Sequence, residues 1–292
     1  MEKYIDIIKN SYSGYWNYLK QELFFQNNWD NYFYGLIAIS LLVWVLEIAF
    51  PWRKDQALFR KDFWLDTFYM FFNFFLLNLI VLIALSNTVA EFFNDILGLV
   101  GLSVSSFQLF DVDSLPLWLG LLIFFLVSDF VQWNTHRLLH RFEFLWSFHK
   151  VHHSVKEMGF SAHLRYHWME PVVYKSILYI PLAIIGGFDA QHVAFIYFFN
   201  IIIGHLNHAN LGWNYGPLKY LLNSPKMHIW HHAKELPVRT GVNFGLTLSI
   251  WDYLFKTNYI PHSGKDIELG FEGDENFPKG FINQELYPLS KK

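Results

Sequence analysis

Three long stretches of the chain carry almost no charge, and this feature limits what the chain can fold into more than any other. Residues 33–50 contain one charged residue, Glu47, residues 67–90 contain none, and residues 114–134 contain only Asp129. A helix needs about 20 predominantly apolar residues to cross a bilayer. Only 16% of all residues are charged, against about 25% in ordinary soluble domains. The chain is therefore predicted to be an integral membrane protein.

Two further apolar segments, residues 172–188 and 190–204, are shorter and are separated by Gly186, Gly187 and Asp189. They fit either a hairpin that spans the membrane or one that enters it partway. The predicted fold is an all-α integral membrane helix bundle with about 4–5 membrane segments. The first 30 residues are typical of an interfacial helix or of an ordinary flanking segment. The N-terminus lacks the pattern of a cleaved signal peptide, so we expect the chain to be anchored by its own helices.

Lys and Arg are distributed unevenly between the loops. Arg53, Lys54, Arg60 and Lys61 lie in the loop after the first span, whereas residues 86–115 contain acidic residues but no Lys or Arg. Loops rich in Lys and Arg face the cytosol. We therefore expect the first loop, the stretch 136–170 and the chain that follows the hairpin to lie on the cytosolic side.

Histidine is clustered and cysteine is absent. None of the 14 histidines precedes His136, and the lack of cysteine excludes thiolate ligands. Three motifs stand out, HRLLH, HKVHH and HIWHH, whose histidines are spaced i, i+4 or i, i+3, i+4 and so share one helical face. This spacing lets two imidazoles reach one ion, or lets three divide between two neighbouring ions. The eight histidines are His136, His140, His149, His152, His153, His228, His231 and His232. Imidazole suits Zn, Cu, Fe and Ni, so the ligands alone do not name the metal.

These motifs resemble the three histidine boxes of the fatty acid hydroxylase and sterol desaturase superfamily, the membrane di-iron oxygenases. HANLGWNYGPLKYLLNSPKMHIWHH and NFGLTLSIWDYLFKT resemble the family's approach to the last box and its closing segment. The resemblance covers residues 125 to 260. It implies two Fe ions as cofactor, exchangeable for Zn during purification, and a cytosolic helical cap that carries the boxes.

Further histidines are candidates for the same site. His208 lies where the family commonly places another histidine, and His205 precedes it by three residues on the same helical face. His163 and His167 are spaced i, i+4. The segment around His167 resembles an Arg-x-His-Pro-x-Glu motif of many relatives, but Trp168 replaces the proline. His167 is therefore either a ligand or a residue that supports one.

Two other histidines, His192 and His262, are interpreted as bystanders.

Three polar residues are candidates for hydrogen bonding to the ligands, because metal-bound imidazoles usually donate their second N–H to a carboxylate or carbonyl. Asp129 precedes His136 by seven residues and so lies on the same helical face. The alternative for Asp129 is an ion pair with Arg137 or another cation. Asn210 and Asp252 are candidates for the same role. No catalytic residue beyond the metal ligands and no further cofactor-binding residue is predicted.

The expected activity is hydroxylation or desaturation of a C–H bond in a lipid such as a sterol or fatty acyl chain, with O2 as co-substrate. The histidines do not distinguish the two outcomes. A zinc-dependent lipid hydrolase on the same histidine cluster is the alternative, and a metal transporter is a third candidate. A transporter needs polar groups at mid-membrane, where only Glu47 is available.

The expected partners are the lipid substrate, the bilayer and an external electron donor (a reductase, ferredoxin or cytochrome), because the chain has no nucleotide-binding or haem motif of its own. Arg137, Arg141, Lys150 and Lys156 either dock an acidic electron carrier or simply follow the positive-inside rule. A net charge of -3 gives no indication of nucleic-acid binding. Residues 1–292 are interpreted as one membrane oxygenase domain: residues 1–114 hold the interfacial helix and two spans, 115–260 the catalytic core, and 261–292 a polar tail.

Overall fold

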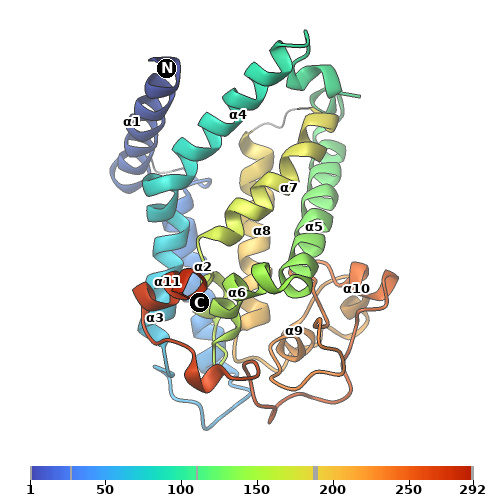
Figure 1. Cartoon of the computed structure of the whole chain (residues 1–292). Coiled ribbons are helices and arrows are strands. Elements are labelled where there is room, and N and C mark those ends of the chain that lie inside the picture. The colour runs from blue at the N-terminus through green and yellow to red at the C-terminus, as the bar shows by residue number, and fades with distance from the viewer. Residues whose placement is uncertain (1, 27, 110, 187–189, 291–292) are drawn as a thin grey trace.

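The structure is a computed structural model that describes residues 2–26, 28–109, 111–186 and 190–290, and within these ranges the chain is helical without strands (Figure 1). The α-helices are α1 (Glu2–Phe24), α2 (Tyr32–Ala49), α3 (Phe63–Phe71), α4 (Ile83–Gly98), α5 (Leu117–Arg141), α6 (Glu143–His153), α7 (Met169–Ile185), α8 (Ala190–His208), α9 (Pro225–His231), α10 (Ile250–Leu254) and α11 (Phe281–Ser290). Short helical segments are η1 (Phe72–Leu76), η2 (Asn78–Leu82), η3 (Val104–Phe107), η4 (Val112–Ser114), η5 (Phe160–Leu164), η6 (Gly216–Tyr220) and η7 (Asp274–Asn276). The prediction of an all-α bundle is confirmed.

Three helical stretches of the described chain are long and apolar enough to cross a membrane. They are Tyr32–Ala49, Phe63–Gly98 and Leu117–Arg141, with 18, 36 and 25 residues. Each overlaps one of the three uncharged stretches of the sequence. Leu41, Leu42 and Val45 on α2 are exposed, as expected for side chains that lipid would cover.

The stretch Phe63–Gly98 is not a uniform α-helix, because η1 and η2 in its middle are π-helical. π-Helical turns are rare and often lie at functional sites. Asn73, in η1, is buried, and its Nδ2 donates to the carbonyl oxygens of Leu164 and Tyr166, both at 2.9 Å. The irregular part of the helix therefore holds η5 and the residue pair that follows it.

The hairpin α7–α8 runs beside α5 (Figure 1). The backbone N–H of Leu109, in the loop before α5, donates to Ile184 O near the end of α7 at 2.8 Å. The 17 residues of α7 extend over about 26 Å, and the hairpin thus reaches the level at which α5 begins. Residues 187–189, at its tip, lie outside the described part.

The hairpin is less apolar than the sequence pattern suggested. Lys175 lies inside α7, and its Nζ is 3.4 Å from Asn78 Oδ1.

Helices α6, α9, α10 and α11 gather at one end of the bundle and form the cap (Figure 1). Glu47, at the end of α2, accepts backbone N–H groups of Phe160 at 3.0 Å and Asn210 at 2.7 Å. This carboxylate therefore links α2 to the cap. From the sequence alone, Glu47 is predicted only as a polar group at mid-membrane.

The tail after residue 260 packs against the rest of the cap. Phe281 lies edge-on to Tyr69 of α3 with ring centroids 4.9 Å apart, and Phe271 and Phe277 are buried. Trp146 of α6 contacts Phe271 at 5.9 Å. The last residues thus cover α6, the helix that carries the second histidine motif.

Candidate metal centre

Nine histidines from four helices and the residue after α9 converge where the spans meet the cap. They form two groups, and within each group one nitrogen of every side chain lies within 4.8 Å of those of the others. The five-histidine group contains His136, His140, His149, His153 and His231. The four-histidine group contains His152, His208, His228 and His232.

In all three motifs, the two histidines spaced i, i+4 belong to the same group. In HKVHH and HIWHH, the histidine between them belongs to the other group. In HKVHH, His149 and His153 belong to the five-histidine group and His152 to the other. In HIWHH the assignment is reversed, since His231 crosses to the five-histidine group. Residues i and i+4 lie above one another on a helix, whereas i+3 is displaced around the axis. Two short helical turns can therefore serve two neighbouring ions.

Hydrogen bonds to backbone carbonyls fix which ring nitrogen carries the proton. His136 Nδ1 is 2.7 Å from Phe244 O, His152 Nδ1 is 3.0 Å from Arg165 O, and His208 Nδ1 is 2.7 Å from Gly204 O. A carbonyl only accepts, so in each case Nδ1 donates and Nε2 holds the lone pair of the neutral ring. The same reasoning applies to His231, whose Nδ1 donates to Val242 O at 2.8 Å.

The Nε2 atoms then face one another without a proton between them. His152 Nε2 and His208 Nε2 are 3.3 Å apart, and both rings have their proton on Nδ1. Two lone pairs at this separation repel unless a cation lies between them. Two nitrogens about 2.1 Å from one ion are about 3.0–3.4 Å apart. The donor set and its spacing therefore fit a metal ion in each group, and buried His140 Nε2, which has no hydrogen-bond partner in the described chain, fits as well.

Burial keeps these imidazoles in the neutral form that binds metal. Loss of hydration lowers the pKa of His152 to about 3. Burial first, and neighbouring imidazoles second, hold the pKa of His153, His228 and His231 well below the usual value.

The segment 242–245 supports two histidines through its carbonyl groups. Asn243 in its middle has φ 54°, a left-handed conformation that Asn tolerates better than most residues. Its Nδ2 donates to Met227 O at 2.9 Å and to Tyr259 O at 2.7 Å. The turn thereby directs the carbonyls on either side of Asn243, those of Val242 and Phe244, at His231 and His136.

Asp252 holds the same segment from the other side. Its carboxylate accepts from the backbone N–H groups of Phe244 at 2.9 Å and Gly245 at 2.8 Å, from Trp133 Nε1 at 3.0 Å and from Thr257 Oγ1 at 2.6 Å. The sequence predicted a direct hydrogen bond from this residue to a ligand. In the structure Asp252 instead holds the backbone of Phe244, whose carbonyl oxygen accepts from His136 Nδ1.

Glu170 is the carboxylate that contacts a histidine of the centre directly. Its Oε2 is 2.9 Å from His149 Nδ1. The sequence pattern contained this glutamate in the altered Arg-x-His-Pro-x-Glu segment but did not assign it a role. A carboxylate on Nδ1 orients the ring and raises the basicity of Nε2.

Asp129 and Asn210 do not contact any histidine in the described chain. Asp129 accepts from Trp251 Nε1 at 2.7 Å, and so ties α10 to α5; the predicted hydrogen bond to a ligand and the alternative ion pair are both not seen. Asn210 exchanges two hydrogen bonds with the backbone of Arg53, at 2.9 and 3.0 Å.

Three other predicted histidines lie beside the two groups. His205 Nε2 is 3.0 Å from Ser40 Oγ, and its Nδ1 is 2.9 Å from His163 Nδ1. His167 Nε2 donates to Glu285 O at 2.7 Å. These contacts occupy both ring nitrogens of His205 and of His167, whereas His163 Nε2 has no partner in the described chain.

The bystander His262 packs on Trp230 with ring centroids 4.5 Å apart, and the side chain of His192 lies outside the described residues.

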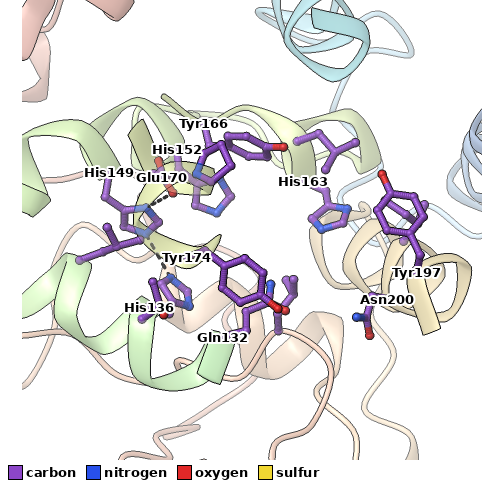
Figure 2. A pocket seen from close by; sticks show the side chains of 16 residues that line it. Gln132, His136, His149, His152, His163, Tyr166, Glu170, Tyr174, Tyr197 and Asn200 are labelled. Atoms are coloured by element: carbon purple, nitrogen blue, oxygen red, sulfur yellow. Dashed lines mark hydrogen bonds and ion pairs between the residues drawn. The ribbon is translucent and has the colours of Figure 1, made fainter. Parts of the chain in front are cut away.

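Two cavities adjoin the centre. The bundle cavity, of about 330 Å³, lies between α5, η5, α7 and α8, and His136, His149 and His152 form part of its wall (Figure 2). The cap cavity, of about 750 Å³, is reached from the other end and is lined by His140, His153 and several charged side chains. The five-histidine group is therefore accessible from both sides.

Residues 121–257 match the sequence model of the fatty acid hydroxylase family. Ornithine lipid hydroxylase of Rhizobium tropici is 31% identical over 180 residues, which are 62% of this chain and 53% of that protein. Alkylglycerol monooxygenase of Xenopus tropicalis is 32% identical over 143 residues, 48% of this chain and 30% of that protein. The human protein of the same name is 32% identical over 136 residues, 46% of this chain and 29% of that protein.

The matched region thus spans about half the length of the first relative and less than a third of the other two. No solved structure matches the chain. All nine histidines of the two groups fall inside the matched residues.

Proposed function

We propose that the protein is a membrane-bound oxygenase that holds two iron ions in its histidine groups, since residues 121–257 match the sequence model of the fatty acid hydroxylase family. With O2 and an external reductant it hydroxylates or desaturates a C–H bond of a lipid. The ligands are the nine histidines of the two groups. The centre lies on the cytosolic side, as the Lys and Arg of the loop 51–62 support.

The observation that carries this proposal is the opposed pair of Nε2 lone pairs on His152 and His208, at 3.3 Å. Both Nδ1 atoms donate to carbonyls, so only a cation relieves the repulsion between the lone pairs. When bound, the two irons would supply the activation of O2 that the side chains of the protein cannot provide by themselves.

The chain's own residues hold the centre and position the substrate. Glu170 and the carbonyls of Phe244, Arg165 and Val242 keep the proton of their histidines on Nδ1. Apolar side chains such as Leu164 and Ile201 line the bundle cavity next to His152. A hydrocarbon chain in that cavity would lie next to the metal ligands and away from bulk water.

The reductant is proposed to approach through the cap cavity. Its rim carries Arg141, Lys150, Lys234 and Arg239, together with acidic residues. The aromatic ring of Trp146 lies 4.9 Å from His140 and 5.1 Å from His153, between this cavity and the five-histidine group. A donor bound there would be close to the centre without entering the bundle cavity.

The test is the metal content of the purified protein, measured by elemental analysis beside a variant with His152→Ala and His231→Ala. His152→Ala removes a proposed ligand from the four-histidine group, and His231→Ala removes one from the five-histidine group. His262→Ala serves as control, since this residue packs on Trp230 outside both groups. We expect about two irons per chain in the parent and the control, and loss of both in the double variant.

Metal that remains in the double variant would contradict the ligand assignment. Turnover of a lipid ester without O2 and reductant would contradict the oxygenase assignment, because hydrolysis needs neither.

A further inference from the structure

The bundle cavity has a reactive end and a polar end. His136 and His149 lie at one end, whereas His163, Tyr197 and Asn200 lie at the other (Figure 2). Polar groups inside a largely apolar cavity are costly unless a ligand or water satisfies them. In ligand sites, a few such groups fix the orientation of the bound molecule.

The side chain of Asn200 is held by a hydrogen bond to its oxygen, and its NH2 group has no partner among the described residues. Thr247 Oγ1 donates to Asn200 Oδ1 at 2.9 Å. This hydrogen bond assigns the oxygen of the amide to Thr247 and leaves Nδ2 with no partner among the described residues. Asn200 therefore offers two N–H groups to a ligand in the cavity.

His163 presents a second polar atom at this end of the cavity, the ring nitrogen Nε2, which has no partner in the described chain. Its other nitrogen, Nδ1, is 2.9 Å from His205 Nδ1. His205 Nε2 is in turn 3.0 Å from Ser40 Oγ, which donates to Met70 Sδ at 3.5 Å. The ring of His163 is thus held through Nδ1, while Nε2 stays free.

Gly204 makes this arrangement possible. A Cβ atom at this position would lie 2.2 Å from His163 Nε2, so only glycine leaves space for the ring. The imidazole also lies nearly parallel to that of His208, with ring centroids 5.2 Å apart and 29° between the planes. His163 is thus locked in place at the border between the four-histidine group and the cavity.

The polar end carries no charge. Among the described residues that line the bundle cavity, Glu170 is the one with an ionisable carboxylate, and it is bound to His149 at the reactive end. No Lys or Arg is among these lining residues. Burying a carboxylate or phosphate there would leave it without a cation.

We propose that Asn200 Nδ2, at the polar end beside His163, donates to an uncharged oxygen acceptor of the substrate, a carbonyl or ether oxygen, and so determines which carbon lies at the reactive end. The inference deepens the proposed function and rests on it. It restricts the substrate to lipids that carry such an oxygen in the same cavity, of about 330 Å³, as the oxidised carbon.

The test compares Asn200→Leu with the parent, using three probes of equal chain length in detergent: a methyl ester, the free carboxylate and a plain hydrocarbon. Leucine keeps the size of the side chain and removes its N–H groups. Ile203→Leu, a volume-conserving change at a buried position of the same helix that does not line the cavity, is the matched control. Binding is followed by the thermal stabilisation of the metal-loaded protein, and the position of oxidation by mass spectrometry of the products.

We expect the parent and Ile203→Leu to bind the ester about ten-fold more tightly than the hydrocarbon, as one hydrogen bond allows. Asn200→Leu should bind both equally and oxidise the ester at scattered positions. Thr247→Val should keep part of the preference, because it leaves the amide in place but lets it rotate.

An unchanged preference for the ester in Asn200→Leu, or tighter binding of the carboxylate than of the ester by the parent, would overturn the inference. Binding of the ester that depends on Asn200, without oxidation of any probe under O2 and reductant, would instead refute the proposed function and leave the assignment of the polar end intact.

Discussion

The protonation of the nine histidines is decided by atoms that belong to other residues. The carbonyls of Val242, Phe244 and Arg165 each accept from an Nδ1 atom. In metalloproteins, removing a group that hydrogen-bonds a ligand weakens metal binding by about 10–100-fold. Here most of these groups are backbone carbonyls, which a substitution cannot remove. Their contribution is therefore tested by substituting the side chains that hold the backbone in place.

Asp252→Asn is expected to destabilise the protein by about 1–3 kcal/mol, because the new NH2 group cannot accept the hydrogen bonds that the buried carboxylate receives. The carbonyl of Phe244 should then lose its alignment with His136, and metal should dissociate more readily. Thermal unfolding and metal retention during dialysis against a chelator measure the two effects. Asp55→Asn, on an exposed loop, should change neither, and equal metal retention in both variants would count against the role of Asp252.

The pH dependence of the metal-free protein follows from the buried imidazoles. Burial holds the pKa below the usual 6.5 for eight histidines outside the spans: His149, His152, His153, His163, His167, His228, His231 and His232. Below about pH 6.5 the unfolded chain binds protons that the folded chain does not, so the free energy of unfolding falls as the pH falls. Burial raises the pKa of Glu285 to about 7 and also raises the pKa of Glu22, Glu170 and Asp252. Their effect has the opposite sign, since their contribution is lost as the pH rises through the raised pKa, but they are four carboxyl groups against eight imidazoles.

We therefore expect the melting temperature of the metal-free protein to drop steadily from pH 7 to pH 5. A flat profile over this range would mean that the imidazoles are not held neutral by the fold.

The structure brings together the eight motif histidines and His208 that the sequence named, and their role as ligands stays a prediction. The i, i+3, i+4 spacing of HKVHH and HIWHH indicated that three histidines could divide between two ions, but not which one would face the other group. A backbone carbonyl gives no such signal, because every residue has one. Asp129 and Asp252 were selected as carboxylates near the motifs, yet the turn at Asn243 brings Phe244 O to His136 in their place.

At the scale of elements, the cap is joined to the spans by a buried ionic network. Asp66 of α3 accepts from Arg60 Nη2 at 2.5 Å and from Arg165 Nη1 at 2.8 Å. All three side chains are buried. Because the carbonyl of Arg165 also accepts from His152, the network connects α3 with the four-histidine group.

Asp66→Asn is expected to cost about 3–5 kcal/mol, since it removes the counter-charge of buried Arg60 and leaves buried Arg165 with the more distant Asp62. Asp62→Asn is the matched control: Asp62 lies 3.3 Å from Arg165 and is 35% exposed, so its loss should cost less than about 1 kcal/mol. Unfolding of both variants in the same detergent provides the comparison. Similar stability of the two variants would contradict the importance of burial in this network.

The spans were predictable because lipid imposes one requirement, a long run of apolar residues, on each. Residues 33–50 and the helix Tyr32–Ala49 agree closely. The π-helical segments were not predicted from the sequence. Asn73, within η1, donates to two carbonyls that lie more than 90 residues away, and contacts of this range have no local sequence signal. Contacts between residues far apart in the sequence, such as Tyr69 with Phe281, also position α11, whose residues the sequence pattern predicts as part of a polar tail.

For the whole molecule, the orientation in the membrane is open to a direct test, because the chain contains no cysteine. Lys54→Cys and Ser105→Cys place a single exposed thiol in the loop before α3 and in the loop before α5. In intact cells, a membrane-impermeant maleimide should label the thiol at position 105, and should label the one at position 54 only after lysis. The reverse pattern would place the histidine groups outside the cell.

The two cavities give the centre the geometry of a phase-transfer catalyst. The bundle cavity reaches His136 and His149 from among the spans, and the cap cavity reaches His140 and His153 from the charged end. For the oxygenase proposed above, a hydrocarbon dissolved in lipid and a donor dissolved in water would thus meet at one site while each stays in its own solvent. The turnover of such a catalyst depends on the mole fraction of substrate in the bilayer, and not on the substrate concentration in the total volume. Diluting the vesicles in buffer should leave the turnover per protein unchanged, whereas diluting the substrate with inert lipid should lower it.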